Sequence, residues 1–176
     1  MPLTADFSVS QPLGEPSIVT VTDTSTGSDG TITARRVYIK DAFGNFIVPE
    51  GVSTEYNAWS IGDTSVDIDC LTKDIAALIT VEWLAGSTVV YSKIEKYGLV
   101  AYNEDFDYSL TQMLAANPMR TNDSKFLEYK FNLRAEIDSG NQALERYGDM
   151  FSAQQCYDRA TAIRLNSQYL FNLASA

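Results

Sequence analysis

Acidic clusters are the residues of this chain whose types and spacing could do chemistry. Asp67 and Asp69 alternate along a predicted strand, and a second cluster, NEDFD at residues 103–107, lies where a helix is predicted to begin. Paired carboxylates can act as general acid and base. Alternate acids are also typical of the solvated face of a strand, and acids at a helix start are favoured by the helix dipole. We therefore expect both clusters to be structural.

Other signatures of catalysis are missing from the sequence. The chain has no histidine, which removes the commonest general base and the commonest metal ligand. Cys70 and Cys156 are far apart and have neither disulfide nor zinc spacing, so we expect two buried apolar side chains. Neither Ser-x-x-Lys nor Gly-x-Ser-x-Gly occurs. We predict that the protein is not an enzyme and has no catalytic residues, cofactor or metal.

The polar stretch TDTSTGSDG at residues 22–30 could be a phosphate cradle, a calcium loop or a turn. It has no lysine after its glycines and leads into a strand, which excludes the phosphate and dinucleotide loops. It also lacks the twelfth-position glutamate and the helices of an EF-hand. We interpret it as a connection between two strands, in which Asp23 accepts backbone hydrogen bonds and Gly27 and Gly30 take positive φ. A calcium ion on Asp23 and Asp29 stays open as an alternative.

The composition limits the partners. The chain has 176 residues, a net charge of −10 and a pI near 4.3, which argues against a nucleic-acid face and against docking on anionic lipid. Residues 1–16 lack the basic and apolar regions of a signal peptide, and no segment approaches the roughly 20 apolar residues of a membrane span. We expect a protein made in a cytoplasm, without a membrane or sequence-specific nucleic acid among its partners.

The elements that position these residues change character along the chain. From residue 6 to 97 apolar residues recur with period two, as in SVDIDCL, where Val66, Ile68 and Cys70 share one face and Asp67 and Asp69 the other. Turn clusters divide this part into about seven short strands. The pattern predicts an immunoglobulin-like antiparallel β-sandwich over residues 1–99.

From about residue 103 the apolar period becomes three to four residues. The segments 123–146 and 152–171 therefore predict two long amphipathic helices, and a shorter helix is predicted over 103–117. Gly148 supplies the turn between the long helices, and Asp149 or Ser152 caps the last one. We expect a helical hairpin domain at residues 100–176, which makes the chain α+β.

This predicted hairpin has more apolar surface than it can hide. A hairpin of about 50 residues buries few of its aromatic rings by itself, so we expect part of its apolar stripe to meet another chain. The candidate subunit interface consists of eight side chains on the two helices: Phe126, Leu133, Ile137, Leu144, Tyr157, Ile163, Tyr169 and Phe171.

Two local stretches resemble known families. VTVTDTSTGSDGTITARRVYI, residues 19–39, resembles the opening of a PKD-type immunoglobulin-like domain, although KDAFGNF at 40–46 replaces the usual Trp-Asp-Phe-Gly-Asp-Gly. That resemblance implies the fold and a spacer or adhesive role. GDMFSAQQCYDRATAI, residues 148–163, resembles the second helix of a tetratricopeptide repeat. Only one copy is present, so we interpret it as convergent packing of a helical hairpin.

The whole chain, with a sandwich, a helical hairpin and no catalytic constellation, is similar to small virion proteins of crAss-like and related short-tailed phages. The resemblance implies a ring-forming protein of the head-to-tail connector or tail barrel. Its expected partners are other copies of itself in a twelve-fold cyclic oligomer, the portal, and the neighbouring ring and tail proteins. The expected location is the virion, after synthesis in the host cytoplasm.

Three alternatives remain open. A capsid decoration or fibre-anchoring protein would use the sandwich as its working part. A PKD-like module that binds polysaccharide or a host surface predicts exposed aromatics on one sheet face, with Trp59 as the candidate, since Trp83 alternates with Ile79 and Val81 and is expected in the core. An enzyme that uses Asp67 or Glu104 is the third.

Overall fold

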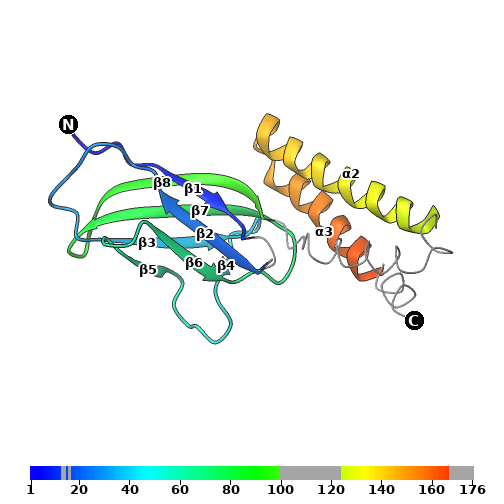
Figure 1. Cartoon of the computed structure of the whole chain (residues 1–176), viewed down its shortest axis with the longest axis horizontal. Helices are drawn as coiled ribbons and strands as arrows, with labels where there is room; N and C mark the ends of the chain where they lie inside the picture. Colours follow the sequence, from blue (N-terminus) through cyan, green and yellow to red (C-terminus); the bar gives the residue numbers. More distant parts are fainter. Residues whose placement is uncertain (13–14, 16, 100–123, 167–176) are drawn as a thin grey trace.

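The protein is a β-sandwich followed by a helical hairpin, and the two parts lie end to end (Figure 1). This computed structural model describes residues 1–12, 15, 17–99 and 124–166. The predicted α+β class is confirmed. The helix predicted over residues 103–117 lies outside the described residues. No helix within the described ranges is long and apolar enough to cross a membrane.

Two antiparallel sheets form the sandwich. The first has the order β1-β2-β6, with β1 (Phe7–Ser10), β2 (Ile18–Asp23) and β6 (Ser65–Asp69). The second has the order β4-β3-β7-β8, and β5 also pairs with β3: β3 (Ala34–Lys40), β4 (Phe46–Ile47), β5 (Asn57–Ser60), β7 (Ile75–Ala85) and β8 (Thr88–Leu99). Because β1, β2 and β6 oppose β3, β7 and β8, the strands are divided as in immunoglobulin-like sandwiches.

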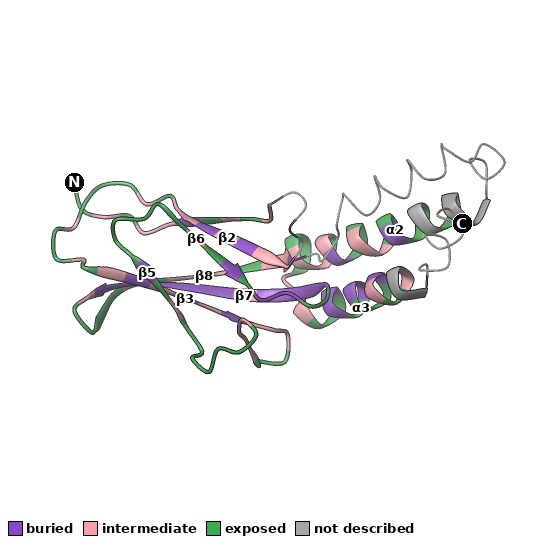
Figure 2. Cartoon of the chain, turned by 60° about the horizontal axis from the view of Figure 1, so that its bottom comes forward, coloured by how far each residue is buried: buried purple, intermediate pink, exposed green. Residues whose placement is uncertain are grey.

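The predicted alternation decides which side chains enter the core. In β6 Ile68 is buried while Asp67 and Asp69 are exposed, as expected. Trp83 of β7 is buried, also as expected. Figure 2 shows that β7 is buried along nearly its whole length. The described residues contain eight strands rather than about seven, and the two-residue β4 is the shortest of them.

A tight turn joins the helices α2 (Ser124–Tyr147) and α3 (Met150–Asn166). Gly148 has φ +59°, and the Asp149 N–H donates to the carbonyl of Ala143 at 3.0 Å, which closes the turn at the end of α2. The Asp149 carboxylate accepts the Ser152 N–H at 3.0 Å and its hydroxyl at 2.7 Å. These bonds hold the pKa of Asp149 below its ordinary value. The predicted turn at Gly148 and the cap at Asp149 are confirmed.

Tyr157 joins the hairpin to the sandwich. Its side chain is fully buried, with the ring against Gly140 of α2 and the hydroxyl against Gly98 of β8. A Cβ at Gly98 would lie 2.0 Å from the Tyr157 hydroxyl, and one at Gly140 would lie 2.6 Å from the ring. The hydroxyl donates to Asn141 Oδ1 at 2.6 Å. One side chain of α3 therefore contacts both the other helix and the sheet.

Gln154 makes another link between hairpin and sandwich. β3 ends opposite Leu78, so the first residues of β7 have no strand partner on that edge. There the Ala76 N–H donates to Gln154 Oε1 at 2.8 Å, and Gln154 Nε2 donates to the Asp74 carbonyl at 3.2 Å. Buried peptide groups need such partners, and an open strand edge invites unwanted pairing. The side chain of α3 thus completes the edge of β7.

We predict that Tyr157→Ala destabilises the protein by about 3–5 kcal/mol, the range for a large aromatic side chain lost from a core. Tyr157→Phe keeps the ring and loses one hydrogen bond, so it should cost about 1 kcal/mol. The free energy of unfolding in urea, followed by far-ultraviolet circular dichroism, measures both. Two variants of nearly wild-type stability would show that Tyr157 does not join the two parts.

Candidate assembly surface

Five of the predicted interface residues pack within the protomer to different degrees. Leu133 and Tyr157 are buried, and Ile137, Leu144 and Ile163 are half-buried. Leu144 packs against the cluster that contains Tyr157. The apolar stripe therefore faces largely inward, and Leu133 and Tyr157 offer no surface to a second chain.

The other three predicted interface residues are not placed. The backbone of Phe126 belongs to α2, but its side chain lies outside the described part of the structure. Tyr169 and Phe171 follow the end of α3 and lie outside the described residues as well. Their contribution to an interface stays a prediction.

Among its described side chains, the hairpin exposes three other aromatic rings, which the sequence analysis did not single out. Phe131, Tyr147 and Phe151 are 74%, 79% and 60% exposed. Phe151 meets Phe43, itself 67% exposed, edge to face with ring centroids 5.7 Å apart. Phe131 falls off the predicted apolar stripe, and an isolated aromatic between polar positions is the sequence signal that could have revealed it. Together these rings form the candidate assembly surface.

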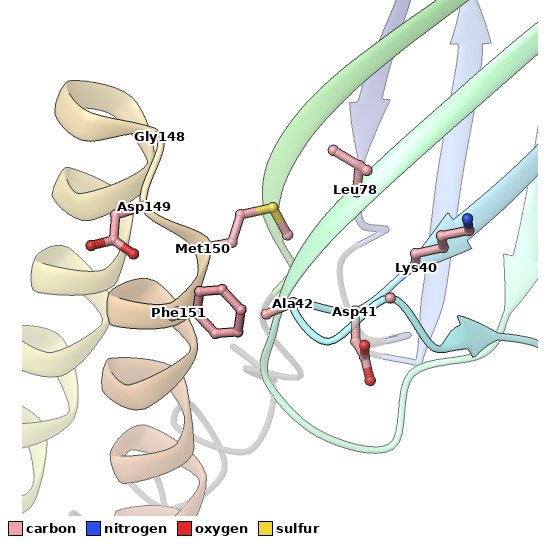
Figure 3. A pocket seen from close by; sticks show the side chains of 9 residues that line it. Lys40, Asp41, Ala42, Leu78, Gly148, Asp149, Met150 and Phe151 are labelled. Carbon is pink, nitrogen blue, oxygen red and sulfur yellow. The ribbon is translucent and has the colours of Figure 1, made fainter.

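A pocket of about 380 Å³ lies beside the Phe43–Phe151 pair, between the β3–β4 turn, β7 and the start of α3 (Figure 3). The Asp41 carboxylate in its wall is used by its own turn, where it accepts the N–H groups of Phe43 and Asn45, both at 2.9 Å. The residues that line the pocket are Lys40, Asp41, Ala42, Gly44, Leu78, Gly148, Asp149, Met150 and Phe151.

The acidic residues of the polar stretch are bound by the protein's own donors. The stretch connects β2 to β3, as predicted. Asp23 Oδ1 accepts the Ser25 N–H at 2.9 Å, while Asp29 accepts the Thr31 N–H at 2.9 Å and the Tyr91 hydroxyl at 3.0 Å. These donors compete with a calcium ion for the lone pairs of both acids. Within the described ranges no group of three or more potential metal ligands comes together.

The glycines of this stretch differ from each other. Gly27 takes positive φ, +81°, as predicted. Gly30 does not, so that part of the prediction is wrong. The N–H and hydroxyl of Thr31 both bond to the Asp29 carboxylate, which shapes the turn around Gly30 without a left-handed residue.

A buried arginine, Arg35, closes the sandwich near this stretch. Its guanidinium forms an ion pair with Asp23, donates to the Ser60 carbonyl at 2.8 Å and stacks 4.1 Å from the centroid of Trp59. Trp59 is only 2% exposed and donates from Nε1 to the Asp63 carbonyl at 3.0 Å. The prediction of Trp59 as an exposed aromatic is therefore wrong, because the arginine draws its ring into the core.

The candidate catalytic groups show ordinary structural surroundings. Asp67 is exposed and accepts the Thr20 hydroxyl at 2.7 Å, which fits the solvated face predicted for β6. Residues 103–107 lie outside the described structure. Cys70 and Cys156 are both free and buried, as expected. Burial raises the pKa of the Cys70 thiol to about 12, so this thiol stays protonated at neutral pH.

No protein-family model and no curated protein matches this chain. Among solved structures, the chain is similar to the solution structure of the fn3 domain of human collagen alpha-1(XX) chain, with 16% identity and a TM-score of 0.37. That likeness covers 57% of this chain and 88% of the collagen domain. The strand order itself, and not this likeness, defines the protein as an immunoglobulin-like sandwich joined to a helical hairpin.

We predict that Asp23→Asn destabilises the protein by about 3 kcal/mol at pH 7, because Arg35 would be left buried without its counter-ion. Burial alone would raise the pKa of Asp23, but hydrogen bonds from Ser25 and the charge of Arg35 hold it below 3.8. In the wild type the stabilisation of the folded state by ionised Asp23 is therefore complete above pH 3.8. It is lost as the pH falls toward the pKa of Asp23 in the folded protein.

Urea unfolding at several pH values measures this contribution. Asp6→Asn is the matched control, because it removes the more exposed ion pair with Lys93 and should destabilise the protein much less than Asp23→Asn. Equal losses for the two variants at neutral pH would contradict a special role for the buried pair.

Proposed function

We propose that this protein is a structural subunit of a bacteriophage particle, which forms an oligomeric ring in the head-to-tail connector or tail barrel. The observation that carries the proposal is the set of three exposed aromatic rings on the hairpin, Phe131, Tyr147 and Phe151. Aromatic side chains are enriched in the cores of protein interfaces.

The rigid joint explains why these rings need another chain. Tyr157 and Gln154 fix the hairpin to the end of the sandwich, so the helices cannot turn the exposed rings onto the sheets. Phe131 and Phe151 also lie on different helices of the hairpin. Two different surfaces on one subunit support a head-to-tail contact, which closes into a ring when the rotation permits.

The proposal includes the finer expectations from the phage resemblance. The ring has twelve copies, its neighbours are the portal and adjacent ring or tail proteins, and it resides in the virion at the head-to-tail junction or tail. The work is done by protein–protein contacts. We assign no catalytic step, membrane partner or sequence-specific nucleic-acid partner to it.

A capsid decoration or fibre-anchoring protein is the rival assembly role, and it would not require a closed ring. A glycan-binding module is less well supported, since its candidate Trp59 is buried. Two rings on the outer face of the five-stranded sheet carry cations: Arg36 lies 4.8 Å from the Tyr56 centroid and Lys40 lies 4.7 Å from the Phe46 centroid. Those ring faces are occupied by protein groups that a stacking sugar would have to displace.

We predict that the purified chain forms an oligomer with about twelve times the 19.5 kDa chain mass, and that serine at Phe131, Tyr147 and Phe151 together abolishes it. The serines remove the apolar surface that drives association, and they should not unfold the protomer because all three rings are exposed. Size-exclusion chromatography with multi-angle light scattering measures the mass.

The matched control carries serine at Ile61, Val89 and Val90, which are exposed and lie near the β7–β8 turn, at the opposite end of β7 and β8 from Ala76 and Gly98. This variant should keep the oligomer. A monomeric wild type, or a hairpin variant with wild-type mass, would contradict assembly through the hairpin. A defined oligomer that is not a ring would favour the decoration role.

A further inference from the structure

We propose that α3, through Gln154 and Thr161, is an edge cap: it takes the place of a strand beside the first residues of β7 and prevents this edge from pairing with another chain. The edge cap acts within one protomer, so it is independent of the proposed phage role. It gives the docked hairpin a second purpose, which is to control which strands of the sandwich can associate.

β7 continues past its neighbour β3 at the end of the sheet nearest the hairpin. The last pair between them is Leu78 with Lys40, whereas β8 stays alongside β7 as far as Ile75. The peptide groups of β7 before Leu78 therefore have β8 on one edge and no strand on the other. In Figure 2 α3 lies beside this end of β7, and Ala76 is fully buried there.

The Gln154 carboxamide makes the bonds that a parallel strand would make at this edge. Its Oε1 accepts the Ala76 N–H at 2.8 Å, and its Nε2 donates to the Asp74 carbonyl at 3.2 Å. One residue of a parallel strand uses its own carbonyl and N–H in the same way, on two residues of the neighbouring strand that are two apart. A single side chain thus reproduces the acceptor and the donor of one backbone residue.

A third hydrogen bond fixes the orientation of this carboxamide. Gln154 Nε2 also donates to Asp158 Oδ1, one turn along α3, at 2.9 Å. A reversed amide would place its oxygen against the Asp74 carbonyl and the Asp158 carboxylate, and an ionised carboxylate and a carbonyl can only accept. Gln154 is 3% exposed, so bulk water does not compete for these bonds.

Thr161 extends the same contact along α3. It follows Gln154 by seven residues, which is close to two turns, so the two side chains lie on the same side of the helix. The Thr161 hydroxyl accepts the Asp74 N–H at 3.3 Å and donates to Asp74 Oδ2 at 2.9 Å. Two positions of one helix face therefore bond to the edge, which makes the edge cap a property of the docked helix.

The sequence of β7 needs such a cover. Residues 75–81 read IAALITV, with no charged residue and no proline. An apolar, uncharged strand edge is a template for pairing with another chain, and proteins protect such edges with charges, prolines, bulges or a covering element. The register shift of β7 lies farther along, at Trp83. The covering helix is therefore the protection that the start of β7 has.

Gln154→Leu tests the edge cap, because leucine is of similar size and removes both bonds to the edge. Gln155→Leu is the matched control, since Gln155 is the next residue of α3 and is exposed. Both substitutions are made in the full chain that also carries serine at Phe131, Tyr147 and Phe151. This background removes the exposed rings of the proposed ring contact, so that association through the strand edge is measured separately.

Amide hydrogen exchange followed by NMR reports on the edge directly. In Gln154→Leu the Ala76 N–H should exchange at least tenfold faster than in Gln155→Leu, because its acceptor is gone. The Ala77 N–H should keep its protection, since successive N–H groups of a strand point to opposite edges and that of Ala77 points toward β8. Equal exchange at Ala76 in the two variants, or equal loss of protection at Ala76 and Ala77, would contradict a cap on one edge.

Sedimentation velocity measures whether the uncapped edge pairs with another chain. Gln154→Leu should self-associate at least tenfold more tightly than Gln155→Leu, and adding Ala76→Pro to the Gln154→Leu chain should reverse this. Proline removes the N–H that an added strand needs, and it is tolerated on a strand edge. Equal self-association of the two leucine variants, or association that survives Ala76→Pro, would overturn the edge cap.

Discussion

The tyrosine at the joint is the interaction on which the rest of the structure depends. Tyr157 occupies space that exists only because β8 and α2 each present a glycine, Gly98 and Gly140, to the ring. Protein interiors are packed at near-crystalline density, so a side chain in such a site has little freedom to move. The two helices and the five-stranded sheet are thereby held as one unit, and what remains exposed on the hairpin is fixed relative to the sandwich.

The two ends of the protomer differ in chemistry because different interactions close them. At the end away from the hairpin, Arg35 forms a buried ion pair with Asp23 and donates a hydrogen bond to the Ser60 carbonyl. The ring of Trp59 is buried there beneath the Arg35 guanidinium. At the hairpin end, Gln154 completes the strand edge. The aromatic rings of Phe43 and Phe151 stay in solvent at this end. The protomer therefore presents different chemistry at its two ends, as the proposed head-to-tail association requires.

Local sequence patterns predicted the helices, strands and turns well, but they predicted poorly which aromatic side chains are buried and which are exposed. Alternation placed Ile68 and Trp83 in the core, and turn chemistry located Gly148 and the Asp149 cap, because each depends on neighbours in sequence. Trp59 was predicted to be exposed because the burial of its ring depends on a contact between strands. Arg35 is buried over this ring and is paired with Asp23 of β2.

The apolar stripe on the predicted helices did not distinguish burial within the protomer from burial against another chain. An apolar stripe predicts that a helix face is buried, but it does not predict whether the same chain or another chain buries it. Tyr157 proved to be covered by the protomer itself, whereas Phe131, off the stripe, stayed exposed.

Electron microscopy of the concentrated wild-type chain tests the central claim, that the hairpin is fixed to the sandwich and leaves aromatic surface for the next subunit. Class averages should show closed rings with rotational symmetry, in which each hairpin lies between two neighbouring subunits. Images of separate single chains, or of assemblies whose contacts involve only the sandwich, would contradict it.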